Sequence, residues 1–96
     1  MKDAMMIGEA LRSALGEERF KEIRDTQRLS EAWGEIAGKK LGKRTRPMSL
    51  KKGRLLVRAE SAAWSAELHM KKEAIMREAM KKLGIEIKEV SVTVGK

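Results

Sequence analysis

The stretch TRPMSLKKGRLLVRAESAAW, residues 45–64, decides the fold, because the chain changes there from a helical period to a period of two and back. Met48 and Leu50 alternate with polar neighbours, and Gly53 supplies the positive φ that a short turn after them requires. The segment after the turn also alternates, with these apolar residues on one face: Leu55, Val57 and Ala59. The stretch therefore predicts a β-hairpin, whose first strand lies at a sheet edge or starts after Pro47, because proline lacks an N–H group.

The segments after the hairpin predict a long helix and a last strand. Ser61 is a suitable N-cap for a helix over residues 62–83, and Gly84 ends it. The predicted buried stripe of this helix consists of Trp64, Leu68, Ile75, Ala79 and Leu83. The segment IEIKEVSVTV, residues 85–94, then predicts a strand with these residues on one face: Val90, Val92 and Val94.

The segments before the hairpin predict helices. Residues 3–15 form the first, which ends at Gly16 and places these residues on one face: Ala4, Ile7, Leu11 and Leu15. The segment EERFKEIR predicts a short helical turn that buries Phe20 and Ile23. A further helix, capped by Asp25 or Thr26 and ending between Gly38 and Gly42, carries these apolar residues at helical spacing: Leu29, Trp33, Ile36 and Leu41.

The order of these elements, α-(α)-α-β-β-α-β, predicts one α+β domain over residues 1–96. The strand–helix–strand unit at its end favours a right-handed crossover between parallel strands. The predicted fold class is therefore KH-like, with helices packed on one face of a small three-stranded mixed sheet.

The composition narrows the class of protein. The chain has no cysteine, so a disulfide framework and a thiolate metal site are both excluded. Charged residues such as Asp3 and Arg12 interrupt the N-terminal apolar run, which therefore does not read as a signal peptide. No segment reaches the roughly 20 apolar residues that a membrane-spanning helix needs. We expect a cytoplasmic protein.

The net charge of +8 is concentrated in one part of the chain. Residues 39–58 contain nine basic and no acidic side chains, whereas the rest of the chain has slightly more acidic than basic ones. The nine are Lys39, Lys40, Lys43, Arg44, Arg46, Lys51, Lys52, Arg54 and Arg58. Lysines that only protect an edge strand from aggregation would explain one or two of them. Nine cations without an acidic neighbour favour binding of a phosphate backbone, with salt-sensitive and largely sequence-independent contacts.

Other sites are weakly indicated. His69 is the only histidine, and a zinc site needs three or four ligands, so no metal and no cofactor is predicted. No nucleophile triad or phosphate loop is present, and the chain is predicted not to be an enzyme. Trp33 and Trp64 fall on apolar helix faces and are predicted to pack in the core rather than to stack on bases. The spacing of Gly34, Gly38 and Gly42 does not make the GxxG loop of RNA-binding KH domains, and favours close helix packing and helix ends.

The central part of the chain resembles a known family. The segments that carry the resemblance are Trp33-Gly-Glu-Ile-Ala-Gly38, Leu41, Thr45-Arg-Pro47, Leu50, Gly53-Arg-Leu-Leu-Val57 and Ser61-Ala-Ala-Trp64-Ser-Ala-Glu67-Leu68. In this order they look like the DciA-type domain, a bacterial family long described as a domain of unknown function. The resemblance covers about residues 26–96 and leaves residues 1–24 as an N-terminal helical segment.

The resemblance implies a KH-like fold and a role in DNA replication. Members of the family bind DNA and the replicative DnaB-type helicase, and help to load the helicase without hydrolysing ATP. The tryptophans, Leu55, Val57 and Leu68 would then define the fold, and the basic hairpin would meet DNA. Many members carry a charged, disordered extension beyond the domain, whereas this sequence stops at Lys96.

Two other functions fit the residues. The chain could be an RNA- or ribosome-associated KH-like module, or a protein–protein adaptor whose basic hairpin meets an acidic partner surface. A membrane and a small-molecule substrate are not expected as partners.

Overall fold

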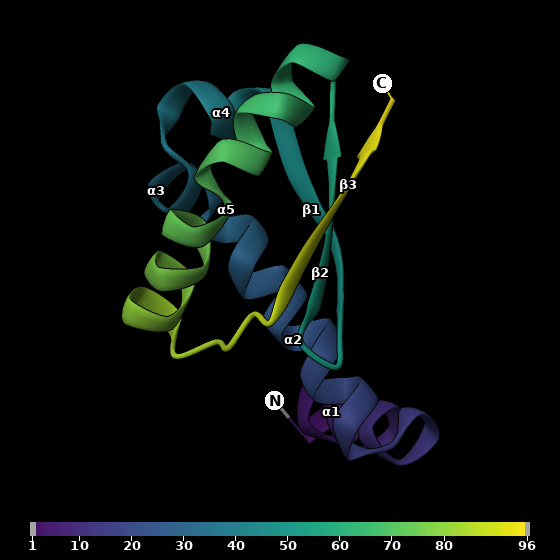
Figure 1. The fold of residues 1–96 in the computed structure, drawn as a ribbon. Helices are drawn as coiled ribbons and strands as arrows, with labels where there is room; N and C mark the ends of the chain where they lie inside the picture. The colour runs from purple at the N-terminus through teal and green to yellow at the C-terminus, as the bar shows by residue number, and fades with distance from the viewer. Residues whose placement is uncertain (1, 96) are drawn as a thin grey trace.

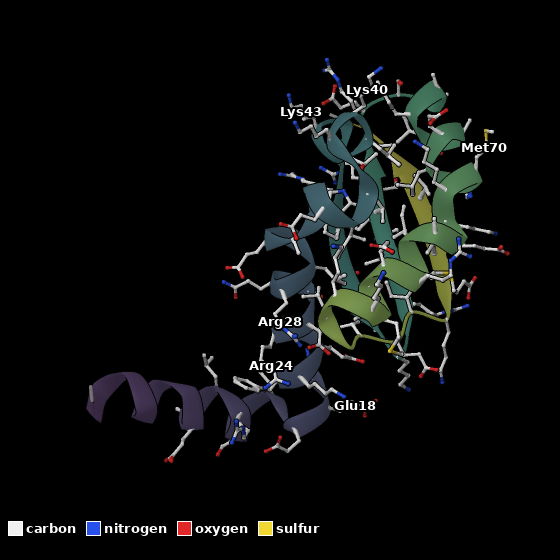
Figure 2. All side chains as sticks on the ribbon, turned by 90° about the vertical axis from the view of Figure 1, so that its left-hand side faces the viewer. Glu18, Arg24, Arg28, Lys40, Lys43 and Met70 are labelled. Atoms are coloured by element: carbon white, nitrogen blue, oxygen red, sulfur yellow. The ribbon has the colours of Figure 1, made fainter. Side chains whose placement is uncertain are left out.

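The computed structural model describes residues 2–95, with side chains from residue 8 onward (Figure 1). Its elements are α1 (Lys2–Leu15), α2 (Glu17–Glu31), α3 (Trp33–Ala37), α4 (Lys39–Arg44), β1 (Thr45–Lys51), β2 (Arg54–Ala59), α5 (Ala62–Leu83) and β3 (Glu89–Val94). On the predicted face of the first helix, the side chains of Ala4 and Ile7 lie outside the described residues. Helix α1 packs on α2 and extends away from the rest of the molecule (Figure 2).

The three strands form one mixed sheet in the order β1-β2-β3. Strands β1 and β2 are antiparallel and joined at Lys52 and Gly53, whose φ angles of 51° and 82° are both positive, as a two-residue hairpin turn requires. Strand β3 runs parallel to β2, with α5 as the connection between them. The predicted α+β class, with its mixed three-stranded sheet and helices on one face, is confirmed.

The core lies between the sheet and the helices. Helix α2 packs against β1, and α5 packs against β2 and β3, all from the same side of the sheet (Figure 1). The core consists mainly of Leu29, Trp33, Ile36, Leu41, Leu50, Leu55, Val57, Leu68, Ile75, Ala79, Ile85, Ile87 and Val90. Within residues 2–95, no helix covers the opposite surface of the sheet, which we call the open face. The apolar stripe of α5 is confirmed at Leu68, Ile75 and Ala79, and so are its Ser61 cap and its left-handed end at Gly84.

A β-bulge corrects the predicted pattern of the first strand. The register between β1 and β2 shifts between Pro47 and Ser49, so β1 has one residue more than its partner there. Leu50 is buried as predicted, but Met48 is displaced to the solvent side and is 37% exposed. The simple alternation of Met48 with Leu50 is therefore wrong, because a period of two does not continue through a bulge.

Helix α2 also differs from the prediction. Residues 17–31 form one continuous helix, so Asp25 lies inside it and is not an N-cap. Asp25 faces the core and is 7% exposed, whereas Ile23 is 51% exposed and not buried as predicted. Two residues correspond to about 200° of rotation around an α-helix, so the two side chains point in opposite directions. Phe20 is half-buried.

Residues 85–94 are only partly a strand. The strand begins at Glu89, and the preceding residues reach it as an extended connection that buries Ile85 and Ile87. Of the three valines predicted to share a face, Val90 is buried and Val92 half-buried, whereas Val94 is 53% exposed.

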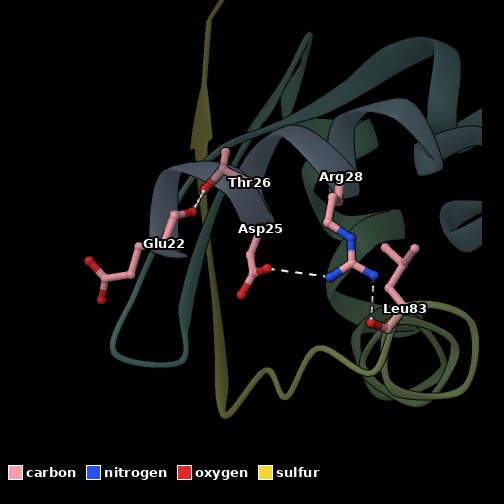
Figure 3. A network of polar contacts seen from close by, with 5 residues as sticks. All are labelled: Glu22, Asp25, Thr26, Arg28 and Leu83. Carbon is pink, nitrogen blue, oxygen red and sulfur yellow. Dashed lines mark hydrogen bonds and ion pairs between the residues drawn. The ribbon is translucent and has the colours of Figure 1, made fainter. Parts of the chain in front are cut away.

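A polar network joins α2 to the end of α5 (Figure 3). Arg28 donates from Nη2 to the carbonyl oxygen of Leu83 at 2.9 Å and contacts Oδ1 of Asp25 from Nη1 at 3.5 Å. The last carbonyl groups of a helix have no partner within the helix, so a cation from another element stabilises them. Arg28 therefore caps α5 and partners the buried carboxylate of its own helix.

We predict that Arg28→Ala lowers the free energy of unfolding by about 1–2 kcal/mol, because Asp25 and the Leu83 carbonyl both lose their partner. Urea unfolding followed by circular dichroism measures the change. Arg24→Ala is the matched control, since Arg24 lies exposed on the same helix and should change the stability by less than about 0.5 kcal/mol. Equal losses for the two variants would contradict the capping role.

Candidate nucleic-acid interface

The structure divides the nine predicted cations into two groups at opposite ends of the hairpin. The head cluster consists of Lys39, Lys40, Lys43, Arg44, Arg46 and Arg58, where α4 leads into the hairpin. The tip cluster consists of Lys51, Lys52 and Arg54, at the turn. Arg54 and Arg58 are four residues apart, about 13 Å along β2. Figure 2 shows Lys40 and Lys43 at one end of the molecule and Glu18 of α2 at the other.

Helix α4 positions four cations of the head cluster. It begins after Gly38, whose φ of 95° breaks the path from α3, and it buries Leu41 as its single core residue. The basic side chains that surround this anchor are exposed: Lys39, Lys40, Lys43 and Arg44. Since β1 begins at the residue directly after Arg44, the basic side chains of the helix lie next to Arg46, the first arginine of the hairpin.

A buried hydrogen-bond chain fixes this arrangement. The indole Nε1–H of Trp33 donates to Oγ1 of Thr45 at 3.0 Å, and that hydroxyl donates to the carbonyl oxygen of Leu41 at 2.7 Å. Thr45 is 6% exposed, so the chain lies away from water, where unmade hydrogen bonds are costly. It ties α3, α4 and the start of β1 together, and it holds the head cluster in one place.

The head cluster surrounds an open hollow of about 310 Å³. Its lining residues are Lys43, Arg44, Thr45, Arg46, Arg58, Glu60 and Gly95. Among the residues that the structure describes, Glu60 is the only carboxylate in this lining, and its Oε1 lies 3.3 Å from Nη1 of Arg44. The hollow is large enough for a phosphate group and its hydration shell, and cations of two strands and one helix face it.

Two arginines of the head cluster lie directly opposite each other. Arg46 on β1 pairs in register with Arg58 on β2, and both side chains are on the open face. Like charges in directly opposed positions destabilise an antiparallel pair. This pair therefore does not serve the stability of the hairpin, and an external anion between the two guanidinium groups would remove the repulsion.

The tip cluster is compensated within the protein. Arg54 Nε lies 3.1 Å from Oε2 of Glu89, and the backbone N–H of Lys52 donates to Oε2 of Glu22 at 2.8 Å. Glu17 and Glu18 of α2 border the same shallow hollow as the tip residues. The prediction of nine cations without an acidic neighbour is thus wrong for the tip, since folding brings carboxylates of α2 and β3 to it. For Arg44, Glu60 supplies one.

The open face contains residues that the sequence reasoning did not assign to a site. Leu56 is 37% exposed and lies between the rows of Arg58 and Arg54 on β2. Its register partners are Ser49 on β1 and Ser91 on β3. The signal was present in the alternation of β2, because the face opposite Leu55 and Val57 carries Leu56 together with the arginines.

The tryptophans and the histidine lie outside this surface. Trp33 is 3% exposed, and its core position is confirmed. Trp64 is half-buried and packs against the core. His69 is exposed on α5, and the described residues include no group of three histidine or acidic side chains that could hold a metal ion. Within the same residues, no helix is long and apolar enough to cross a membrane.

The three glycines have structural roles, as predicted. Gly38 separates α3 from α4, and Gly42 allows the two helices to approach. A Cβ atom on Gly42 would lie 3.0 Å from the Cα atom of Gly34, whereas a Cβ atom on Gly34 meets nothing within 4 Å. The close contact places α4, and with it the head cluster, directly on α3.

We predict opposite effects of alanine at these two glycines. Gly42→Ala should lower the free energy of unfolding by about 1–2 kcal/mol, because the methyl group meets the backbone of α3 and the shift exceeds the gain in helix propensity. Gly34→Ala should raise it by about 0.5–1 kcal/mol, since only the propensity changes. Urea unfolding of both variants measures this, and equal signs would show that the helices do not depend on this contact.

A comparison with protein families identifies the chain. The model of the family described as Dna[CI] antecedent, DciA, matches residues 6–92. No curated protein matches the chain. The match begins inside α1 and therefore includes most of the first helix, which the resemblance in the sequence had left out. Because nearly all of the chain is matched, it belongs to the DciA family.

Proposed function

We propose that this DciA-family chain is a non-enzymatic, DNA-binding accessory protein of DNA replication that assists the loading of a DnaB-type replicative helicase in the cytoplasm. The family is one of helicase loaders and accessory proteins, and it is not a catalytic family. Its membership supports the helicase as partner. The charge of the head cluster supports DNA as the second partner.

The observation that carries the DNA-binding part is the imbalance of charge at the head cluster. Six cations of α4, β1 and β2 gather there, and the lining of their hollow includes one carboxylate. Cations concentrated on a rigid surface attract a polyanion more strongly than the same charge spread over the molecule. Lysine and arginine side chains at this density favour contacts to phosphates, which position a protein but carry little sequence information.

The open face extends this surface. Leu56 lies between the arginine rows and gives a small apolar area that would contact sugars or unstacked bases. Ser91 and Thr93 of β3 add hydroxyl groups on the same face. Single-stranded DNA, whose bases are accessible, would use both the cations and the apolar area, so we propose it as the preferred form.

We predict that the head cluster, and not the tip cluster, binds DNA. The head variant replaces Lys40, Lys43 and Arg46 by Gln, and the tip variant replaces Lys51, Lys52 and Arg54 by Gln, so both lose three positive charges. Fluorescence anisotropy with single-stranded and duplex DNA at several salt concentrations measures the affinity. The head variant should bind at least about tenfold more weakly, with a log–log salt slope that is less steep by about 2–3.

The tip variant should bind within about threefold of the unchanged protein, because Arg54 already pairs with Glu89 and carboxylates of α2 line the same hollow as Lys51 and Lys52. Equal losses in the two variants would contradict a localised site. Tighter binding of RNA in the same titration would favour an RNA- or ribosome-associated module. If the protein bound no nucleic acid, or bound it with an affinity that did not depend on salt, the result would favour a protein–protein adaptor.

We also predict a direct complex with the helicase. The chain should co-elute with the purified DnaB-type helicase of the same organism in size-exclusion chromatography, without added ATP. Nuclease treatment of both samples is the control, because DNA could otherwise bridge two basic surfaces. Separate elution after nuclease treatment would contradict a helicase-loading role and would leave DNA binding as the supported part.

A further inference from the structure

The two edges of the sheet differ in their protection against pairing with another strand. Strand β1 contains Pro47 and a bulge. Proline and bulges are two devices by which natural proteins block an edge. Strand β3 has neither of them. Its sequence EVSVTV contains no proline or glycine, and all six of its residues are in unbroken register with β2.

The backbone of β3 offers a row of hydrogen-bonding groups on its outer side. The N–H groups of Glu89 and Gly95 donate toward β2, to the carbonyl oxygens of Gly53 at 3.2 Å and Ala59 at 2.9 Å. Backbone groups alternate in direction along a strand. The backbone N–H and C=O groups of Val90, Val92 and Val94 therefore point away from β2. No described residue lies on that side of β3 to form hydrogen bonds with these groups.

We propose that β3 pairs with β3 of a second copy of this chain, antiparallel and about a two-fold axis at Val92. The two sheets then form one continuous sheet of six strands. The three outward residues are symmetric about Val92, so Val90 stands opposite Val94 and Val92 stands opposite its own copy. In an antiparallel ladder these are hydrogen-bonded pairs, and each exchanges two N–H···O bonds.

The side chains of this register fit a second copy. Val90, Val92 and Val94 all point to the helix-covered side, so Val94, which is 53% exposed in the single chain, comes to lie on Val90. On the open face, Ser91 stands opposite Thr93, and two hydroxyl side chains form a favourable pair. The single charge of the strand, Glu89, already interacts with Arg54. No two like charges of β3 oppose each other.

An apolar groove beside the start of β3 also favours a second copy of this chain as the partner of β3. Met76 and Met80 of α5 line it together with Ile87, and Met80 is 48% exposed. The chain leaves this groove to enter β3, two residues after Ile87. In the antiparallel register, Val94 of the second copy lies opposite Val90, three residues from Ile87 and on the side of α5.

Repulsion between the two head clusters does not prevent the pairing. Arg58 lies on β2, so the two copies of Arg58 are separated by three strand spacings, about 14 Å. This exceeds the Debye length of about 8 Å at physiological ionic strength. Added salt should therefore strengthen the dimer slightly, whereas it weakens DNA binding. The opposite signs separate this proposal from the proposed function, and neither depends on the other.

Analytical ultracentrifugation of the full chain over a range of concentrations tests the pairing. The 10.8 kDa chain should form a dimer of twice that mass as the concentration rises. Two double variants at exposed open-face positions test the register. Ser91→Lys with Thr93→Lys places like charges opposite each other, whereas Ser91→Lys with Thr93→Glu places opposite charges there. The second should dimerise at least about tenfold more tightly than the first.

Hydrogen exchange gives a second readout that does not need a variant. In the dimer, the amides of Val90, Val92 and Val94 should become protected as the concentration rises, whereas Ser91 and Thr93 should be protected at every concentration. Thermal unfolding of both double variants shows whether each is folded. A chain that stays monomeric at all concentrations overturns the proposal, and so does a dimer in which both double variants associate equally or the valine amides remain unprotected.

Discussion

The buried hydrogen bonds from Trp33 to Thr45 and from Thr45 to Leu41 are the constraint on which the site depends. Each joins a helix to the first residue of the hairpin, in a place where water cannot replace a lost partner. Together with the close contact of Gly42 and Gly34, these hydrogen bonds fix the position of α4 against α3. The cations of α4 therefore stand beside Arg46 and Arg58 as part of a rigid surface, and their repulsion is not relieved by movement of the helix.

Folding also sorts the charges. The hairpin is long enough to separate its two ends by more than a Debye length, so each end has its own electrostatic surroundings. At the tip, α2 and β3 supply carboxylates, and the local charge is reduced. At the head, Glu60 is the one carboxylate in the hollow within residues 8–95. A basic segment of the sequence thus becomes one site that attracts polyanions and one surface that mainly stabilises the fold.

Much of the architecture followed from patterns of short range. The hairpin turn, the Ser61 cap, the Gly84 end and the buried stripe of α5 depend on neighbouring residues and were predicted. The errors at Met48, Ile23 and Asp25 have a shared cause. A bulge and a helix that continues through a possible cap are selected by packing between α2 and β1, and no local preference indicates them.

The sequence by itself determined the α+β class, the resemblance to the DciA family and the concentration of positive charge between residues 39 and 58, because these depend on periodicity, order and composition. Only the tertiary structure decided which of the cations lack a carboxylate and which edge of the sheet is open. Both properties depend on residues that are distant in the sequence: Glu22 and Glu89 reach the tip, and β3 pairs with β2 on one side only. Such contacts arise when the core forms, since burial brings together elements that have no local relation.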